Sequence, residues 1–295
     1  MVSRIDYHGW KDCYRLASST LEAIIVPAIG RIMQLRRIGD NAGAFWENRE
    51  LDGKLPQPDS GTWTNFGGDK CWPAPQSDWP GVLGHEWPPP AAFDASPFEA
   101  SITEAGLTLK SPVDHAWGIQ LVRHIEIDAA RPVMRVRNEF RKVQGKPVRV
   151  AIWTIAQFND PDCVAIKLPV ESRFPGGYTH LSKPDPAELE VTGRLLTFVR
   201  HPSEFVKIGS DARAVVWVGP SSVVQMQSEV VAGEFPDSGC SVEVYTNPGV
   251  QKYVELETLG ALVNLEAGQI IEHTTTYTVR ARTSADARVE AQKAF

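Results

Sequence analysis

Gly118-Ile-Gln-Leu-Val-Arg-His-Ile-Glu-Ile127 is a segment in which apolar and polar residues alternate along most of its length. Successive side chains of a β-strand point to opposite faces of the sheet, so the apolar residues at positions 119, 121, 125 and 127 would share one face. His124 would lie on the opposite, more polar face with Gln120 and Glu126. This pattern predicts a strand with one buried face and one solvated face.

Short segments of this kind recur along the chain and are separated by turn residues. After strand-like residues 14–47, the candidates are residues 98–103, 107–111, 118–127, 133–140, 148–156, 164–168, 195–200, 214–218, 223–230, 240–246, 252–259 and 270–282. Many short strands with turns between them are typical of an all-β sandwich or barrel. Residues 284–293 predict a short helix, because good helix formers follow a capping Ser284 or Asp286. No repeat or obvious linker interrupts the series, so we predict one all-β domain over residues 1–295.

Composition and charge restrict the classes of partner. The 295 residues are 42% hydrophobic and 22% charged, as in ordinary globular proteins. The net charge of −6 argues against nucleic-acid binding, since no dense basic run could neutralise phosphates. The sequence has no apolar run long enough to span a membrane and no signal-peptide core at its start. We therefore expect a cytoplasmic protein of open oligomeric state, with free thiols at Cys13, Cys71, Cys163 and Cys240.

Residues 65–90 are unusually rich in proline, glycine and tryptophan. Six prolines remove backbone donors, which argues against an ordinary strand or helix, and the aromatic content argues against disorder. We predict an ordered aromatic loop, whose rigid rings and directional polar groups would suit a small polar ring such as a sugar. The alternative is a tryptophan- and proline-rich plug over one end of a β-sandwich. Its candidate ligand contacts are Asn65, Asp69, Lys70, Trp72, Gln76, His85 and Glu86.

Alternation along residues 251–259 places Tyr253, Glu255 and Glu257 on one face. Two neighbouring carboxylates repel each other, so one of their pKa values can rise into the range useful for proton transfer. The alternative is a solvated face, which is common in antiparallel sheets.

Three further features point to a cleft or to the core. Arg123 falls on the apolar face of residues 118–127, where it either anchors a structural ion pair or lines a cavity. Trp153 and Gln157 share a face that is either core or the base of a cleft. Residues 169–193 predict a second long loop that could border such a cleft. No spacing predicts a metal or a cofactor, and hydrolase, zinc-protease, P-loop and dinucleotide motifs are absent from the sequence.

Several segments resemble galactose mutarotases, the aldose 1-epimerases. Ser241-Val-Glu-Val-Tyr-Thr-Asn-Pro-Gly-Val-Gln-Lys-Tyr253 resembles the family's V-Y-T-x-x-P-G-x-Q-x-Y segment, with one residue missing between Thr246 and Pro248. Leu256-Glu-Thr258 resembles its L-E-T segment, which carries the catalytic glutamate. Residues 265–277 resemble the family's closing strand, and residues 26–32 resemble the start of mutarotase-like domains. Residues 65–76 and 87–90 resemble an uncharacterised bacterial branch of the superfamily.

The resemblance implies a β-supersandwich of two large antiparallel sheets, with a sugar cleft on the concave face of one sheet. It implies that Glu257 matches the family's general base, with Glu255 as the alternative one pleat away. The family's two histidines would fall on Phe66 and near Trp153-Thr154.

Mutarotation also needs a general acid, because the ring oxygen must receive a proton. With neither histidine in place, the resemblance leaves Lys70, His85 or Arg123 for this role, or a proton shared with Glu255. Lys70 could instead pair with a carboxylate or phosphate of the substrate.

Together these features predict a carbohydrate-binding, mutarotase-like protein whose partner is a small-molecule sugar. The favoured activity is that of a sugar 1-epimerase or related isomerase acting on an aldose or a sugar acid. The alternatives are a non-catalytic carbohydrate-binding protein and a lyase or hydrolase that uses the same cleft. The expected catalytic residues are Glu257, Glu255, Lys70 and His85. The expected substrate contacts are Asn65, Asp69, Trp72, Gln76, Arg123, Trp153, Gln157 and Tyr253.

Overall fold

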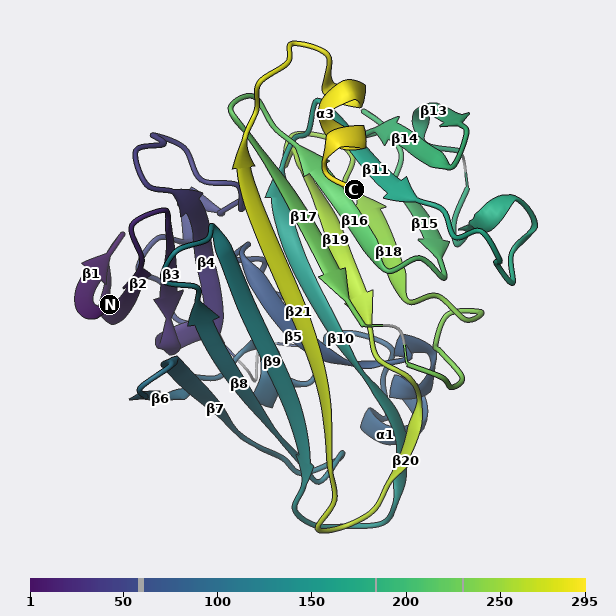
Figure 1. The fold of residues 1–295 in the computed structure, drawn as a ribbon. Coiled ribbons are helices and arrows are strands. Elements are labelled where there is room, and N and C mark those ends of the chain that lie inside the picture. Colours follow the sequence, from purple (N-terminus) through teal and green to yellow (C-terminus); the bar gives the residue numbers. More distant parts are fainter. Residues whose placement is uncertain (58–60, 184, 230) are drawn as a thin grey trace.

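A computed structural model describes residues 1–57, 61–183, 185–229 and 231–295 of the chain. The described residues form two large antiparallel sheets that pack face to face (Figure 1), which confirms the predicted all-β class. Residue 230, the predicted end of one strand, and Pro184 of the predicted second loop lie outside these ranges. No helix within them is long and apolar enough to cross a membrane.

The first sheet carries the candidate site described below. Its strands follow the order β1-β2-β3-β4-β5-β10-β19-β18-β15-β12, and β20 pairs with β10. The bounds are β1 (Val2–Tyr7), β2 (Trp10–Ala17), β3 (Leu21–Val26), β4 (Arg31–Arg37), β5 (Asp69–Ala74), β10 (Val148–Asn159), β12 (Thr179–His180), β15 (Val206–Ser210), β18 (Val242–Thr246), β19 (Tyr253–Leu259) and β20 (Val263–Leu265).

The second sheet covers the inner face of the first. Its strands follow the order β13-β14-β11-β16-β17-β21-β9-β8-β7-β6. The bounds are β6 (Glu99–Ile102), β7 (Gly106–Asp114), β8 (Ile119–Ile127), β9 (Val133–Lys142), β11 (Cys163–Lys167), β13 (Ala187–Thr192), β14 (Leu195–Val199), β16 (Ala214–Val218), β17 (Ser222–Ser228) and β21 (Ile270–Ala281).

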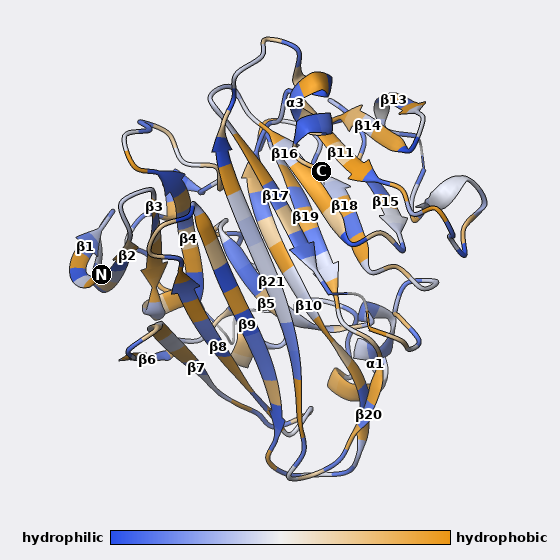
Figure 2. Ribbon diagram, in the orientation of Figure 1, coloured by the Kyte–Doolittle hydropathy of each residue, from blue (hydrophilic) through white to orange (hydrophobic). Residues whose placement is uncertain are grey.

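Alternation explains which face of each strand is buried. Figure 2 shows hydrophobic and hydrophilic residues alternating along β8 and β9, whose apolar side chains face the space between the sheets. In β5, by contrast, all six residues are buried, and so are nine consecutive residues of β10. These two strands lie in the middle of the first sheet and are covered on both faces.

The helices are short, and the C-terminal one packs on the outer face of the second sheet (Figure 1). α3 (Ala287–Lys293) begins three residues later than the predicted segment, because the Asp286 carboxylate caps it by accepting from the amides of Arg288 and Val289. It contacts β11 and β16 with Ala291. The others described are α1 (Trp79–Leu83), α2 (Ala91–Asp94) and the 3-10 turns Pro27–Ile29, Arg49–Leu51, Gln76–Asp78 and Pro175–Gly177.

The prediction that residues 65–90 form a loop is wrong for β5, which pairs with β10 at six positions. Pro73 is compatible with the strand because β4 pairs with β5 only at Ile32 and Asp69. Beyond Asp69 the outer edge of β5 has no ladder partner among the described strands, so a missing amide removes no ladder bond there. The Pro73 carbonyl instead accepts a hydrogen bond from the Trp79 indole at 2.9 Å.

Asp69 and Arg123 form a buried ion pair between the two sheets. The Asp69 carboxylate binds the Arg123 guanidinium from β8 and the Tyr277 hydroxyl from β21. Asp69 and Lys70 are adjacent in β5, so their side chains point to opposite faces, and Asp69 faces the core. The structure therefore resolves the alternatives for Arg123 in favour of the structural ion pair, and the predicted roles of Asp69 and Arg123 as substrate contacts do not fit their position.

His273 of β21 gives the stability of the fold a pH dependence. Its ring is buried, its Nε2 lies 3.0 Å from the Thr258 hydroxyl, and burial lowers its pKa from 6.5 to about 4. The unfolded imidazole gains a proton near pH 6.5, whereas the folded one gains it only near pH 4. The titration of His273 therefore leaves the free energy of unfolding unchanged above about pH 6.5 and lowers it as the pH falls from 6.5 to about 4. The loss should approach about 3 kcal/mol, at roughly 1.4 kcal/mol per pKa unit.

Urea unfolding between pH 4 and pH 7 measures this effect. We expect His273→Gln, which cannot titrate, to flatten this part of the stability curve relative to the wild type. Parallel curves for the two proteins would contradict the assignment.

Candidate active site

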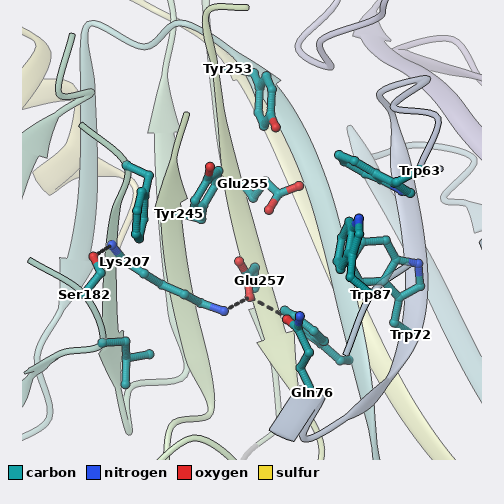
Figure 3. Close-up of a pocket in the computed structure, with 13 residues that line it drawn as sticks. Trp63, Trp72, Gln76, Trp87, Ser182, Lys207, Tyr245, Tyr253, Glu255 and Glu257 are labelled. Atoms are coloured by element: carbon teal, nitrogen blue, oxygen red, sulfur yellow. Dashed lines mark hydrogen bonds and ion pairs between the residues drawn. The ribbon is translucent and has the colours of Figure 1, made fainter. Parts of the chain in front are cut away.

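A pocket of about 350 Å³ opens on the face of the first sheet that points away from the core. Figure 3 shows the carboxylates of Glu255 and Glu257 between tryptophan rings on one side and the rings of Tyr245 and Tyr253 on the other. Aromatic walls around a few polar groups are typical of small-molecule sites. The residues that line the pocket are Trp63, Trp72, Gln76, Trp87, Trp153, Leu181, Ser182, Phe205, Lys207, Tyr245, Tyr253, Glu255 and Glu257.

The register of three neighbouring strands brings the polar groups together. Lys207 of β15 lies opposite Tyr245 of β18, which lies opposite Glu255 of β19. Two residues further along, Glu243 of β18 lies directly opposite Glu257 of β19. Because side chains two residues apart share a face, all five point toward the pocket side of the sheet.

Glu257 lies at the base of the pocket. Its Oε2 accepts a hydrogen bond from the Trp153 indole at 2.6 Å and lies 3.1 Å from Lys207 Nζ (Figure 3). Its Oε1 has no donor among the described residues. Burial, and then the charge of Glu255, raise the pKa of Glu257 above its usual value. This carboxylate is held in place by one oxygen while the other can accept a proton.

Lys207 is a charged lining residue that the sequence analysis does not name. Its Nζ lies 2.5 Å from Glu243 Oε2 and 3.1 Å from Glu257 Oε2, and 4.7 Å from the centre of the Trp153 ring. Burial lowers the pKa of Lys207, but the two carboxylates outweigh it and raise the pKa above the usual value. Lys207 is therefore a protonated donor beside Glu257. A signal for it exists, because the alternation in Val206-Lys-Ile208 would point the lysine away from the core.

Glu255 is bound by residues behind the pocket. Its Oε1 accepts hydrogen bonds from Lys70 Nζ at 3.0 Å and from Gln157 Nε2 at 2.9 Å. Lys70 is only 1% exposed, its Nζ lies 4.9 Å from the centre of the Trp72 ring, and burial lowers its pKa. Lys70 and Gln157 thus support Glu255 and are not among the described residues that line the pocket.

A buried ion pair orients two tryptophans of the pocket, Trp63 and Trp72, which we call the tryptophan wall. The indoles of Trp63 and Trp72 both donate to the Asp94 carboxylate of α2, at 2.9 and 3.0 Å. Asp94 in turn binds Arg31 Nη2 at 2.5 Å. Both partners of this ion pair are buried, so the two indoles are held in one orientation.

The remaining candidates lie outside the pocket. His85 is in an exposed segment between α1 and α2, and Asn65 is buried, with its Oδ1 accepting from the amide of Gly67; neither is among the described residues that line the pocket. Phe66, where the resemblance would place a histidine, packs on Trp10. The predicted second loop also contains β12 and β13, and its residues 181 and 182 reach the pocket.

No group of three or more His, Cys, Asp and Glu side chains in the described ranges is arranged to hold a metal ion.

Comparison with known proteins identifies the architecture. No family model matches the sequence, and a search of curated proteins finds no match. A galactose mutarotase-like protein from Lactobacillus casei aligns with a TM-score of 0.60 at 10% identity, covering 91% of this chain and 100% of that one. The chain has the galactose mutarotase-like fold.

Two further solved structures share this mutarotase-like fold. A galactose mutarotase-like protein from Clostridium acetobutylicum has a TM-score of 0.59 at 10% identity, with 96% of this chain and 99% of that chain covered. A galactose mutarotase related enzyme from Lactobacillus acidophilus has a TM-score of 0.57 at 11% identity, with 93% and 99% covered. At such identities the likeness shows the fold, and the chemistry must be argued from the residues of the pocket.

Proposed function

We propose that this mutarotase-like protein is a sugar 1-epimerase that interconverts the α and β anomers of an aldose. One observation carries the proposal: Glu257, buried at the base of an aromatic pocket, lies 3.1 Å from the protonated Lys207. A base and an acid are thus paired at the place where a sugar ring would lie. Perturbed titratable groups in a pocket are a recognised indicator of catalysis.

The reaction needs only these two groups. Glu257 takes the proton of the anomeric hydroxyl while Lys207 gives a proton to the ring oxygen, so the bond between C1 and the ring oxygen breaks and an open-chain aldehyde forms. Rotation about the C1–C2 bond exposes the other face of the aldehyde. The hydroxyl then attacks C1, Lys207 recovers its proton and Glu257 returns its own. No oxidant or other reactant is consumed.

The charges of the pocket favour a neutral aldose over a sugar acid or a sugar phosphate. Lys207, the only cation among the described lining residues, is already held by Glu243 and Glu257. Lys70, the other candidate for an anionic group, is buried against Glu255. A carboxylate or phosphate would therefore enter beside Glu255 and Glu257 without a free cation to offset the repulsion.

NMR saturation exchange between the two anomer resonances tests the proposal with a panel of neutral aldoses, uronic acids and sugar phosphates. We expect faster exchange for at least one neutral aldose and none for the phosphates. Acceleration confined to anionic sugars would contradict the charge argument. Binding without acceleration would favour the non-catalytic carbohydrate-binding alternative.

Trp87 should contribute to sugar affinity. The residue is 42% exposed at the pocket, and its ring contacts the rings of Trp63, Trp72 and Trp79, so the exposed part of the ring can meet the C–H face of a sugar. We expect Trp87→Ala to weaken binding by about 1–2 kcal/mol, roughly five- to thirtyfold in Kd. Trp87→Phe, which keeps an aromatic face, is the control. Calorimetric titration that shows equal affinity for the alanine variant and the wild type would rule out this role.

A further inference from the structure

Glu243 is a carboxylate that the proposed reaction does not use and that is placed against the residues it does use. The side chain is 0% exposed and is not among the described residues that line the pocket. It lies directly opposite Glu257 in the pairing of β18 with β19. Its Oε2 is 2.5 Å from Lys207 Nζ. Two buried carboxylates therefore share one ammonium group.

Packing on one side of Glu243 contributes to its burial. On the far side of β18 it lies opposite Gly209 of β15. A Cβ atom at Gly209 would lie 2.3 Å from Cys240 Sγ and 3.0 Å from a methyl carbon of Leu181, so a side chain there would collide with both. The missing side chain lets these two residues pack over this part of the sheet. Glu243 consequently has no route to bulk solvent through this side.

The charges of Glu243, Glu257 and Lys207 favour the binding of one additional proton. The charged and titratable groups that face Glu243 are Lys207 from β15, Glu257 from β19, and Asp237 and Cys240 from the turn before β18. If both glutamates were ionised, Glu243, Glu257 and Lys207 would carry a net charge of −1 before the nearby Asp237 is counted. Like charges at such close range cannot both ionise cheaply, and one added proton makes Glu243, Glu257 and Lys207 together neutral.

We propose that Glu243 is a positioning residue that holds this extra proton, so that Glu257 remains the carboxylate beside Lys207. The role of Glu243 in catalysis rests on the proposed sugar epimerase activity. The presence of a proton on Glu243 does not depend on that activity. Burial raises the pKa of Glu243 well above its usual value, and Lys207 lowers it only in part. This direction agrees with the geometry.

The proton on Glu243 would keep Glu243, Glu257 and Lys207 together neutral through the reaction. Before proton transfer, Glu257 is negative, Lys207 is positive and Glu243 is neutral. After Glu257 has taken the hydroxyl proton and Lys207 has given one to the ring oxygen, all three are neutral. The net charge of Glu243, Glu257 and Lys207 is zero in both states, so the base of the pocket need not stabilise a new net charge.

The location of the proton can be measured without any sugar. Infrared spectra and carbon-13 spectra of glutamate-labelled protein at neutral pH should show a protonated buried carboxyl group in the wild type. Glu243→Gln should abolish this signal in both spectra, and Glu243→Asp should retain the protonated carboxyl band in the infrared spectrum. The matched control is Glu139→Gln, because Glu139 is buried on the other sheet and ionised between Arg137 and Arg141. A wild type without the signal, or a signal that survives in Glu243→Gln, would overturn the proposal.

The catalytic role has its own readout. Glu243→Gln carries an uncharged amide in place of the protonated carboxyl group, and the readout is the pH dependence of its anomer exchange rate relative to its own rate at neutral pH. The wild-type rate should fall at alkaline pH as Glu243 loses its proton, and this fall should be absent in Glu243→Gln. Identical pH profiles for the two proteins would overturn the positioning role. A protonated carboxyl signal without anomer exchange would reject the epimerase and keep the proton on Glu243.

Discussion

Glu257→Gln should abolish most of the anomer exchange while leaving sugar affinity within about threefold of the wild type. The amide oxygen can still accept from the Trp153 indole, as Glu257 Oε2 does at 2.6 Å, so the shape of the pocket is retained. The amide cannot take the proton of the anomeric hydroxyl. Loss of a positioned general base costs about 10²–10⁴ in rate. Saturation exchange and calorimetric titration on the same preparations measure the two quantities separately.

Glu255→Gln is the matched control, because both glutamates lie on β19 and line the same pocket. Glu255 is already engaged by Lys70 and Gln157 and is not bonded to the candidate acid. We therefore expect a loss at least tenfold smaller than that of Glu257→Gln. The reverse order of the two losses would transfer the role of base to Glu255.

Asp69→Asn should destabilise the fold by about 3–5 kcal/mol, because it leaves the buried Arg123 guanidinium without its counter-charge. Both side chains are fully buried between the sheets. The double substitution Asp69→Asn with Arg123→Met should be more stable than Asp69→Asn alone, since it removes the unpaired charge. Urea unfolding of the wild type, both single variants and the double variant measures this directly.

A stability change below about 1 kcal/mol for Asp69→Asn would contradict the ion-pair assignment. The pocket itself should tolerate the change better than the fold, because Asp69 lies on the face of β5 opposite to Lys70. Retained sugar binding in folded Asp69→Asn protein would agree with its position outside the pocket.

The sequence predicts those site residues whose position depends only on the alternation of side chains along one strand. Residues two apart on one strand share a face whatever the strand pairs with, and Glu255 and Glu257 both line the pocket. The same rule separates Asp69 from Lys70, but it does not apply to the loop predicted over residues 65–90. Their prolines suggested irregular structure, and only the incomplete pairing of β4 with β5 explains how Pro73 fits a strand.

Other parts depend on contacts between distant residues, which one sequence does not reveal. Lys207 meets Glu257 because β15 pairs with β18 and β18 pairs with β19. The link from Asp94 to the tryptophan wall likewise joins α2 to β5 and to Trp63. Strand order decides both contacts, and hydrophobic alternation carries no information on strand order.

The measurement that tests the epimerase most directly is saturation exchange between the anomers of a neutral aldose, with wild-type protein and Glu257→Gln at equal concentration. We expect exchange well above the uncatalysed rate for the wild type and a rate near the uncatalysed one for the variant. A wild-type protein that binds the sugar without accelerating exchange, or a variant as fast as the wild type, would contradict the assignment of Glu257 as the base of a sugar 1-epimerase.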